Sequence, residues 1–200
     1  MKRQYIKDIQ LETESIICGW VEKIREQKTM QFVIIKDSTG CIQVAIEKEK
    51  QPEIAKIVST LTRQSVVRFK GKTVKAEMVK LGGIEFLPTE IEVESIAQEL
   101  PIDSESGKEL KMDYRWIDLR QEKEKLIFQI RTYAEMVMRE YFIQKGYIEI
   151  HSPKITSQCS EGGADVFALD YYGQKAYLTQ SPQFYKQMAM ASGFEKVFEI

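Results

Sequence analysis

The hydrophobic pattern of this chain changes its period once, and that change restricts the possible folds more than any other feature. From about Ile16 to Ile96, apolar residues fall in short alternating runs, which are typical of β-strands. From near Gln121 to near Lys145, they recur every three or four residues, as on one face of a long helix. We therefore expect a small β domain followed by a domain that begins with a long helix.

The first domain is expected to be a small barrel. Its predicted order is strands at 16–21, 31–36 and 41–46, a helix opened by Pro52, and strands at 65–75 and about 84–96. Residues 37–40 form a predicted turn between the second and third strands, and the charged segment 22–29 is expected to follow the first strand. Three strands, a helix and two strands is the order of the five-stranded Greek-key OB barrel. A generic small barrel is the alternative.

A linker is predicted at 100–113, because Pro101 and Gly107 interrupt both periodicities there. The long helix follows, and Gly146 stops it. Its broad apolar face requires a large partner surface, which is either the core of its own domain or a dimer interface. The members of this face are Leu126, Ile130, Tyr133, Val137 and Tyr141.

The C-terminal part combines short strands with one further helix. We predict strands at 147–151, 166–169, 175–178 and 196–200, with a polar loop at 156–164. Ser181 suits a helix N-cap and Pro182 the first helical position, so a helix is expected from there towards Ser192.

Composition excludes several classes of function. With 29 Lys and Arg against 30 Asp and Glu, the net charge of −1 argues against a nonspecific nucleic-acid binder, although one local surface could still recognise RNA. His151 is the only histidine and the three cysteines are far apart, which argues against zinc sites and disulfide frameworks. Gly71-Lys72-Thr73 lacks the earlier glycine of a phosphate-binding loop, because Val66 occupies that position. No apolar run is long enough to span a bilayer, so a cytoplasmic location is expected.

Several motifs resemble those of a known family. Residues 142–153 (FIQKGYIEIHSP) resemble motif 1 of class II aminoacyl-tRNA synthetases, a helix followed by a strand that ends in proline. Residues 160–167 (SEGGADVF) and 180–187 (QSPQFYKQ) are similar to aspartyl-tRNA synthetases, and 194–200 resembles the approach to motif 2. The N-terminal barrel and the YRWIDLR segment at 114–120 are most similar to the archaeal and eukaryotic type. The resemblance covers almost the whole chain.

The resemblance implies an all-β OB-fold barrel followed by the first part of an α+β class II catalytic domain, an antiparallel sheet with helices. It implies an anticodon-binding domain at 1–100, a hinge at 101–120 and the N-terminal part of the catalytic domain at 121–200. The implied reaction is ATP-dependent activation of L-aspartate, assisted by Mg²⁺, and transfer of aspartate to the 3′ end of tRNA. Aspartate tRNA is the implied partner, and whether asparagine tRNA is a second one is left open. A homodimer through the motif 1 helix and strand, including Pro153, is also implied.

The same resemblance suggests site residues. Glu161, Ser181, Gln183 and Lys186 match the aspartate-binding positions, while Phe32, Gln43 and Glu85 match positions that bind the central anticodon base. The arginines of motifs 2 and 3, which bind ATP, follow Ile200 in the family, so no catalytic residue or metal ligand is named within these 200 residues. The 200 residues alone are therefore expected to be inactive. The alternatives are a non-catalytic, dimerising RNA-binding module and a paralogue that makes an amide from aspartyl-adenylate.

Overall fold

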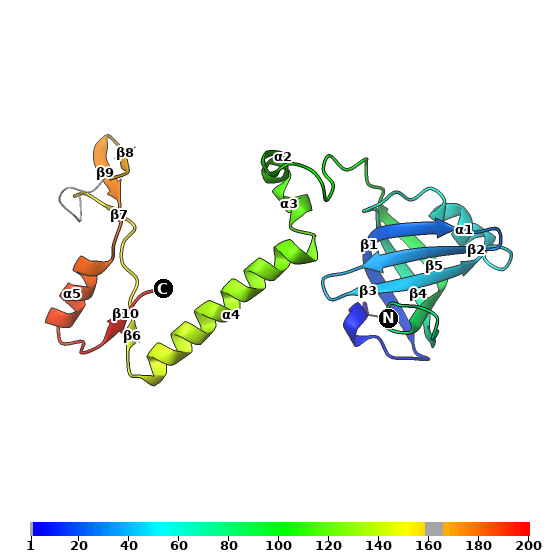
Figure 1. Cartoon of the computed structure of the whole chain (residues 1–200), viewed down its shortest axis with the longest axis horizontal. Helices are drawn as coiled ribbons and strands as arrows, with labels where there is room; N and C mark the ends of the chain where they lie inside the picture. Colours follow the sequence, from blue (N-terminus) through cyan, green and yellow to red (C-terminus); the bar gives the residue numbers. More distant parts are fainter. Residues whose placement is uncertain (1, 159–165) are drawn as a thin grey trace. The chain divides into compact units, whose positions relative to one another are not determined.

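The computed structural model describes residues 2–158 and 166–200. Contacts between Cα atoms divide the chain into two units, Met1–Glu105 and Ser106–Ile200. The first unit is built around strands β1–β5, and the described part of the second contains α2–α5 and five short strands (Figure 1).

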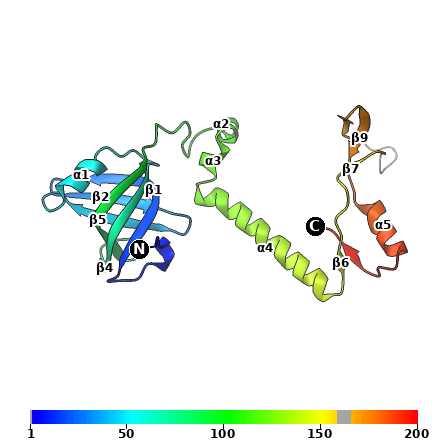
Figure 2. The same ribbon diagram turned by 180° about the vertical axis from the view of Figure 1, so that it is seen from behind.

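The first unit is a closed barrel of five strands (Figures 1 and 2). The strands are β1 (Glu14–Glu26), β2 (Met30–Lys36), β3 (Cys41–Glu47), β4 (Val66–Lys75) and β5 (Ile84–Ser95), hydrogen-bonded in the order β1-β2-β3-β5-β4. The β3–β5 pair is parallel and the other pairs are antiparallel. Helix α1 (Pro52–Val58) lies between β3 and β4 in the sequence. This arrangement confirms the predicted OB fold.

Alternation along the strands produces the barrel core. Along β2, every second residue from Gln31 is buried, and the intervening residues are only partly buried. Helix α1 adds Ile54, Ala55 and Val58 to the same core, which explains the helical spacing of apolar residues after Pro52. The largest apolar side chains that are fully buried are Phe69 and Phe86, on β4 and β5.

The predicted turn after β2 is built around a buried carboxylate. Asp37 is only 1% exposed and accepts hydrogen bonds from the backbone N–H groups of Ile6 (2.8 Å), Thr39 (2.7 Å) and Gly40 (3.1 Å). Burial by itself raises the pKa of Asp37, but the donors around the carboxylate outweigh it and lower that pKa. Ile6 belongs to the 3₁₀ helix η1 (Ile6–Asp8), so Asp37 ties the N-terminal segment to the barrel.

One predicted boundary in the barrel was wrong. The charged segment after Val21 was expected to follow the first strand, but β1 continues to Glu26. Residues 23–26 pair with 31–34 of β2 after an irregularity between Val21 and Lys23. Charged side chains are tolerated there because one face of this pair is exposed to solvent.

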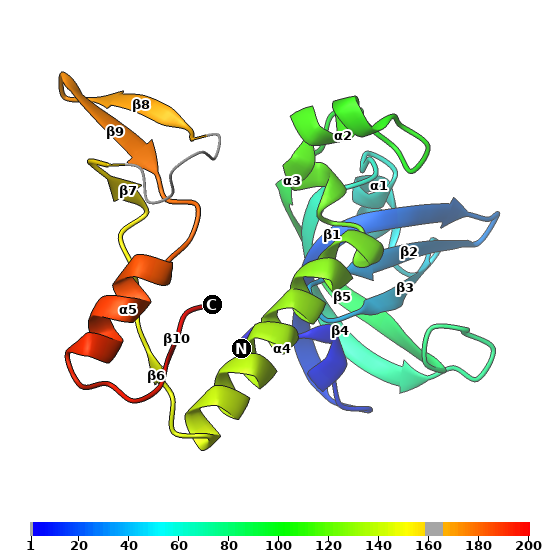
Figure 3. The same cartoon turned by 60° about the vertical axis from the view of Figure 1, so that its left-hand side comes forward.

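The second unit contains four helices and two small sheets among its described residues (Figure 3). The helices are α2 (Lys108–Asp113), α3 (Arg115–Asp118), α4 (Glu122–Gln144) and α5 (Gln183–Ala191). One sheet pairs β6 (Ile148–Glu149) in parallel with β10 (Val197–Phe198). The other has the antiparallel order β7-β9-β8, from β7 (Ile155–Thr156), β8 (Ala168–Tyr171) and β9 (Gln174–Leu178). Part of the predicted linker is thus helical in α2, and β7 is a strand that the sequence pattern did not predict.

Helix α4 has almost the predicted bounds, and its C-terminal end is held to β6 and β10. The Arg139 guanidinium donates two hydrogen bonds to the Glu149 carboxylate, at 2.8 and 3.0 Å, and their contact lowers the pKa of Glu149. Phe142 stacks on Phe198 with ring centroids 4.8 Å apart. Gly146 follows the helix with φ of +78°, a left-handed conformation that glycine adopts without strain.

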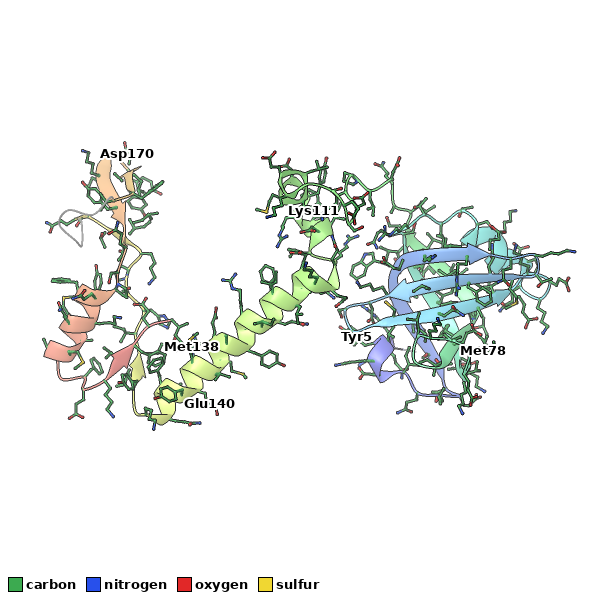
Figure 4. The ribbon with its side chains drawn as sticks, viewed as in Figure 1. Tyr5, Met78, Lys111, Met138, Glu140 and Asp170 are labelled. Atoms are coloured by element: carbon green, nitrogen blue, oxygen red, sulfur yellow. The ribbon has the colours of Figure 1, made fainter. Side chains whose placement is uncertain are left out.

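No residue of α4 is buried in this chain, and its side chains project all around the helix (Figure 4). The five residues of the predicted apolar face are all more than half exposed. The described residues of the second unit therefore leave this face uncovered. No helix among residues 2–158 and 166–200 is both long and apolar enough to cross a membrane.

Candidate nucleic-acid interface and amino-acid site

Three residues predicted to bind the anticodon lie on neighbouring barrel strands. Phe32 is on β2, Gln43 on β3 and Glu85 on β5. Gln43 is directly opposite Glu85 in the parallel β3–β5 pair, and Phe32 is directly opposite Arg25 of β1. The barrel thus brings together four side chains from four strands.

These four side chains form one connected cluster. The Arg25 Nη2 donates to Gln43 Oε1 at 2.5 Å, and the Gln43 Nε2 donates to Glu85 Oε1 at 2.6 Å. The Arg25 guanidinium also lies over the Phe32 ring, with Cζ 5.5 Å from the centroid. Gln43 is 7% exposed, and both ends of its amide have a partner, as a buried amide requires.

The cluster lines a cleft of about 660 Å³. Residues 76–81, in the connection between β4 and β5, form another part of its wall. Met78 projects from this connection and is 97% exposed (Figure 4). Gly82 and Gly83 follow with φ of +76° and +68°, a conformation that few other residues adopt, and they lead the chain back into β5.

The chemistry of the cleft suits an unpaired nucleic-acid base. An aromatic ring offers a stacking surface, the guanidinium offers hydrogen-bond donors, the carboxylate offers acceptors and the amide offers both. Arg25 was missed at the sequence level because it lies in the charged segment that was placed outside the strand. Its position opposite Phe32 becomes evident only once the β1–β2 register is known.

Three of the four residues predicted to bind aspartate, Ser181, Gln183 and Lys186, lie at or near the start of α5. The Ser181 Oγ accepts a hydrogen bond from the Gln183 backbone N–H at 3.2 Å, and the Lys186 N–H donates to the Pro182 carbonyl at 3.0 Å. The helix begins at Gln183 with Pro182 as its N-cap, so the predicted start was one residue too early. Gln183 and Lys186 are three positions apart on α5, hence on the same side of the helix. Gln183 is exposed and Lys186 is half-buried, while Glu161 lies outside the described residues.

Pro153 is exposed and lies in a segment with several polar contacts. The Pro153 carbonyl accepts a hydrogen bond from Thr179 Oγ1 at 3.0 Å. On the preceding residue, Ser152, the backbone N–H and Oγ both donate to Glu199 Oε1, at 3.1 and 3.0 Å. Burial alone raises the pKa of Glu199, but hydrogen bonds from Lys154 and Ser152 outweigh it and lower that pKa to about 2. The sequence analysis did not identify Glu199.

Two known families match the two parts of the chain. Residues 16–94 match the family described as "OB-fold nucleic acid binding domain". Residues 107–200 match the family described as "tRNA synthetases class II (D, K and N)". The first match contains the whole Arg25–Phe32–Gln43–Glu85 cluster, and the second contains α4, α5 and the Ser152–Glu199 contact.

Similar proteins include archaeal aspartate–tRNA ligases. The chain is 40% identical over 210 residues to an aspartate–tRNA(Asp/Asn) ligase of Methanopyrus kandleri, with 100% of this chain and 48% of the relative covered. It is 40% identical over 191 residues to an aspartate–tRNA(Asp) ligase of Pyrococcus horikoshii, covering 92% of this chain and 43% of the relative. The chain therefore spans about half the length of these relatives.

The structure is similar to that of a solved synthetase. Asparaginyl-tRNA synthetase from Pyrococcus horikoshii, complexed with asparaginyl-adenylate, superimposes with a TM-score of 0.90 at 29% identity. The similarity covers 100% of this chain and 47% of that structure. Both units thus have counterparts in one known protein.

Proposed function

Because the chain belongs to the class II aminoacyl-tRNA synthetases and matches the N-terminal portion of archaeal-type aspartate enzymes, we propose that a protein carrying it joins L-aspartate to tRNA. The barrel recognises the anticodon, and the second unit supplies part of the aspartate site. The proposed boundaries are 1–100 for the anticodon domain, 101–120 for the hinge and 121–200 for the first part of the catalytic domain.

The hydrogen-bonded cluster around Gln43 is the observation on which the RNA part of the proposal rests. By the genetic code, anticodons for aspartate and for asparagine both have uridine at the centre. Uracil presents an acceptor, a donor and an acceptor along its pairing edge, which the donors of Arg25 and the acceptors of Glu85 complement. Phe32 supplies the surface on which this base stacks. Gln43, held between Arg25 and Glu85, orients the two charged groups.

The proposed reaction has two steps. A carboxylate oxygen of aspartate forms a bond to the α-phosphorus of ATP, and the bond to pyrophosphate breaks. The product of this first step is aspartyl-adenylate. A ribose hydroxyl at the 3′ end of tRNA then attacks the carbonyl carbon of this adenylate, the hydroxyl loses its proton, and AMP leaves. Both steps depend mainly on positioning and on offsetting charge, so they need no histidine or cysteine nucleophile from this chain.

In this scheme, residues of the second unit bind aspartate. Lys186 supplies a fixed cation for the side-chain carboxylate, Gln183 orients the amino acid and Glu161 attracts the α-ammonium group. Ser181 shapes the start of α5 through its bond to the Gln183 N–H. The described residues contain no group of three or more His, Cys, Asp or Glu side chains that could hold a metal ion.

The exposed apolar face of α4 is proposed as a homodimer interface, together with the β6 strand and Pro153. Five large side chains that are each more than half exposed form a surface that a second copy could bury. An equilibrium sedimentation measurement on the whole protein, compared with a Val137→Glu variant, tests this assignment. We expect a dimer that the variant dissociates, and a monomeric parent protein would contradict it.

Two measurements test the proposed function. A protein that carries this chain and a complete catalytic domain should catalyse ATP–pyrophosphate exchange with aspartate and not with asparagine. The 200-residue chain should bind an anticodon stem-loop with central uridine more tightly than one with central adenosine. RNA binding without exchange would support the non-catalytic RNA-binding alternative, and loss of both properties would overturn the proposal.

A further inference from the structure

The segment Ser152–Lys154, just after β6, is held by hydrogen bonds on two sides. On one side is Glu199, whose Oε1 accepts from the Ser152 N–H and Oγ and from the Lys154 ammonium group. These contacts join residues 45 and 47 positions apart in the sequence. They connect the end of β6 with the end of β10.

Thr179 holds the same segment from the other side. Its Oγ1 donates to the Pro153 carbonyl at 3.0 Å, and its N–H donates to the Lys154 carbonyl at 3.0 Å. Pairing continues directly into the sheet, because Ile155 of β7 pairs with Leu178 of β9. The segment is therefore fastened to the end of β9, two residues before Ser181.

Burial makes the Glu199 contact expensive to break. The Glu199 side chain is only 5% exposed, although Lys154 is 68% exposed. A buried carboxylate has lost its hydrating water, and hydrogen-bond donors of the protein offset the free-energy cost of that loss. If the donors are removed, nothing offsets it. Its second oxygen, Oε2, is also buried and accepts no hydrogen bond from the described residues, so three donors converge on Oε1 alone. Among the described residues, the donors to this carboxylate thus come from Ser152 and Lys154.

The segment lies at the junction of three elements. Helix α4 leads into it through β6, to which Arg139 and Glu149 fasten the helix. Residues Gln180–Pro182 connect Thr179 to α5, and β10 leads directly to Glu199. A displacement of this segment would therefore move the start of α5 relative to β6 and β10.

We propose that Glu199 and Thr179 are positioning residues, which hold Ser152–Lys154 as a brace that sets the position of the N-terminal end of α5. Neither residue contacts aspartate in this proposal. They act through Gln183 and Lys186, whose distance from the rest of the aspartate site depends on where α5 begins. The consequence for aspartate binding rests on the proposed function, whereas the mechanical link between Glu199 and Thr179 does not.

The mechanical link can be measured in the 200-residue chain by amide hydrogen exchange. Glu199→Gln should accelerate exchange of the Thr179 amide by roughly tenfold, because its bond to Lys154 opens more often once the brace loosens. The Gly173 amide, which donates to Asp170 Oδ1 at 2.8 Å in the same sheet, should not change. Glu195→Gln is the matched control, since it makes the same chemical change at an exposed position four residues earlier.

Unchanged exchange at Thr179 in Glu199→Gln would overturn the brace. Equal acceleration at Thr179 and Gly173 would do the same, because it would indicate general loosening of the unit. If Glu199→Gln prevents folding, Thr179→Val replaces it and the Ser152 amide becomes the reporter. Thr179→Val removes only the Oγ1 donor. We then expect faster hydrogen exchange of the Ser152 amide but not of the Gly173 amide.

The effect on aspartate is measured in a protein with a complete catalytic domain. Glu199→Gln and Thr179→Val should each raise the KM for aspartate by about tenfold, because misplacement of a binding group weakens its contact with the ligand. The KM for ATP should stay within about twofold of the parental value, because neither variant touches the groups assigned to ATP. In the double variant, the KM for aspartate should rise by less than the product of the two single increases, as expected for residues that hold one segment.

These outcomes separate the two proposals. A parent protein without aspartate-dependent exchange would refute the proposed function, and hydrogen exchange would still decide whether the brace exists. An active parent with an unchanged KM for aspartate in both variants would refute the positioning role alone. Equal increases in the KM for aspartate and for ATP would also refute it, because they would indicate a merely structural effect.

Discussion

Gln43 and Glu85 are 42 positions apart in the sequence, yet they are directly opposite each other on parallel strands, with Gln43 Nε2 2.6 Å from Glu85 Oε1. The other end of the Gln43 amide accepts a hydrogen bond from Arg25. The orientation of this amide is therefore determined before any ligand binds. A base that enters the cleft meets donors and acceptors that are already arranged, which lowers the entropic cost of recognition.

Replacement of Phe32 by alanine should weaken binding of an aspartate anticodon stem-loop by about 1–3 kcal/mol, because one stacking surface is lost. Titrations of the 200-residue chain at matched salt measure the change. Phe32→Tyr is the control, since it keeps the ring and should bind nearly as tightly as the parent. If Phe32→Ala also binds like the parent, the RNA-binding face of the barrel lies elsewhere.

Gln43→Ala should relax discrimination at the central base more than it lowers overall affinity. Without the amide, Arg25 and Glu85 each lose the hydrogen bond to Gln43 that orients them. A well-oriented polar contact to a base contributes about 1–3 kcal/mol of discrimination between bases. Stem-loops with each of the four bases at the central position, titrated under identical conditions, measure this. Unaltered preference for uridine would contradict the role assigned to Gln43.

Lys186→Met, in a protein with a complete catalytic domain, should lower kcat/KM for aspartate by at least roughly 100-fold. The variant removes a charge-assisted contact of about 1.5–3 kcal/mol and leaves the substrate carboxylate without a partner. The KM for ATP should change far less. Lys175→Met, at an exposed position on β9, is the matched control and should behave like the parent. Parental kcat/KM for aspartate in Lys186→Met would rule out the assignment.

Acid should destabilise the second unit partly through Glu199. Its pKa falls from 4.5 to about 2 on folding, so the charged form stabilises the folded state above about pH 4.5. This contribution is lost progressively as the pH falls from 4.5 towards 2. Equilibrium unfolding at several pH values should give a shallower pH dependence across this range for Glu199→Gln than for the parent. Identical slopes would show that Glu199 has the same pKa in the folded and unfolded states.

Gly71→Ala should destabilise the barrel by at least about 1–3 kcal/mol, because an added methyl group cannot fit. Its Cβ would lie 2.1 Å from the Leu87 carbonyl oxygen, where β4 pairs closely with β5. Gly107→Ala is the control, since nothing lies within 4 Å of its Cβ position and its φ of −63° suits alanine. Thermal unfolding measures both variants, and equal melting temperatures would contradict the close approach.

Local patterns in the sequence were sufficient for most elements of the fold, although β7, α2 and the end of β1 were not predicted. The order of barrel strands follows from runs of alternating residues separated by turns, and the bounds of α4 follow from its period and from Gly146. The Phe32, Gln43 and Glu85 assignments came from a resemblance and remain predictions of function. The structure adds that their side chains, with Arg25, line one cleft.

The features that the sequence did not reveal depend on contacts between distant residues. Arg25 joins the cleft because β1 continues through a charged segment, which pairs with β2. Glu199 is an ordinary glutamate in the sequence, and only the parallel β6–β10 pairing brings it to Ser152 and Lys154. The spacing of apolar residues shows which face of a strand or helix is turned away from water, so the sequence by itself determined most strands and helices of this protein. Register and long-range hydrogen bonds depend on the packed chain, so the tertiary structure alone decided which polar side chains meet.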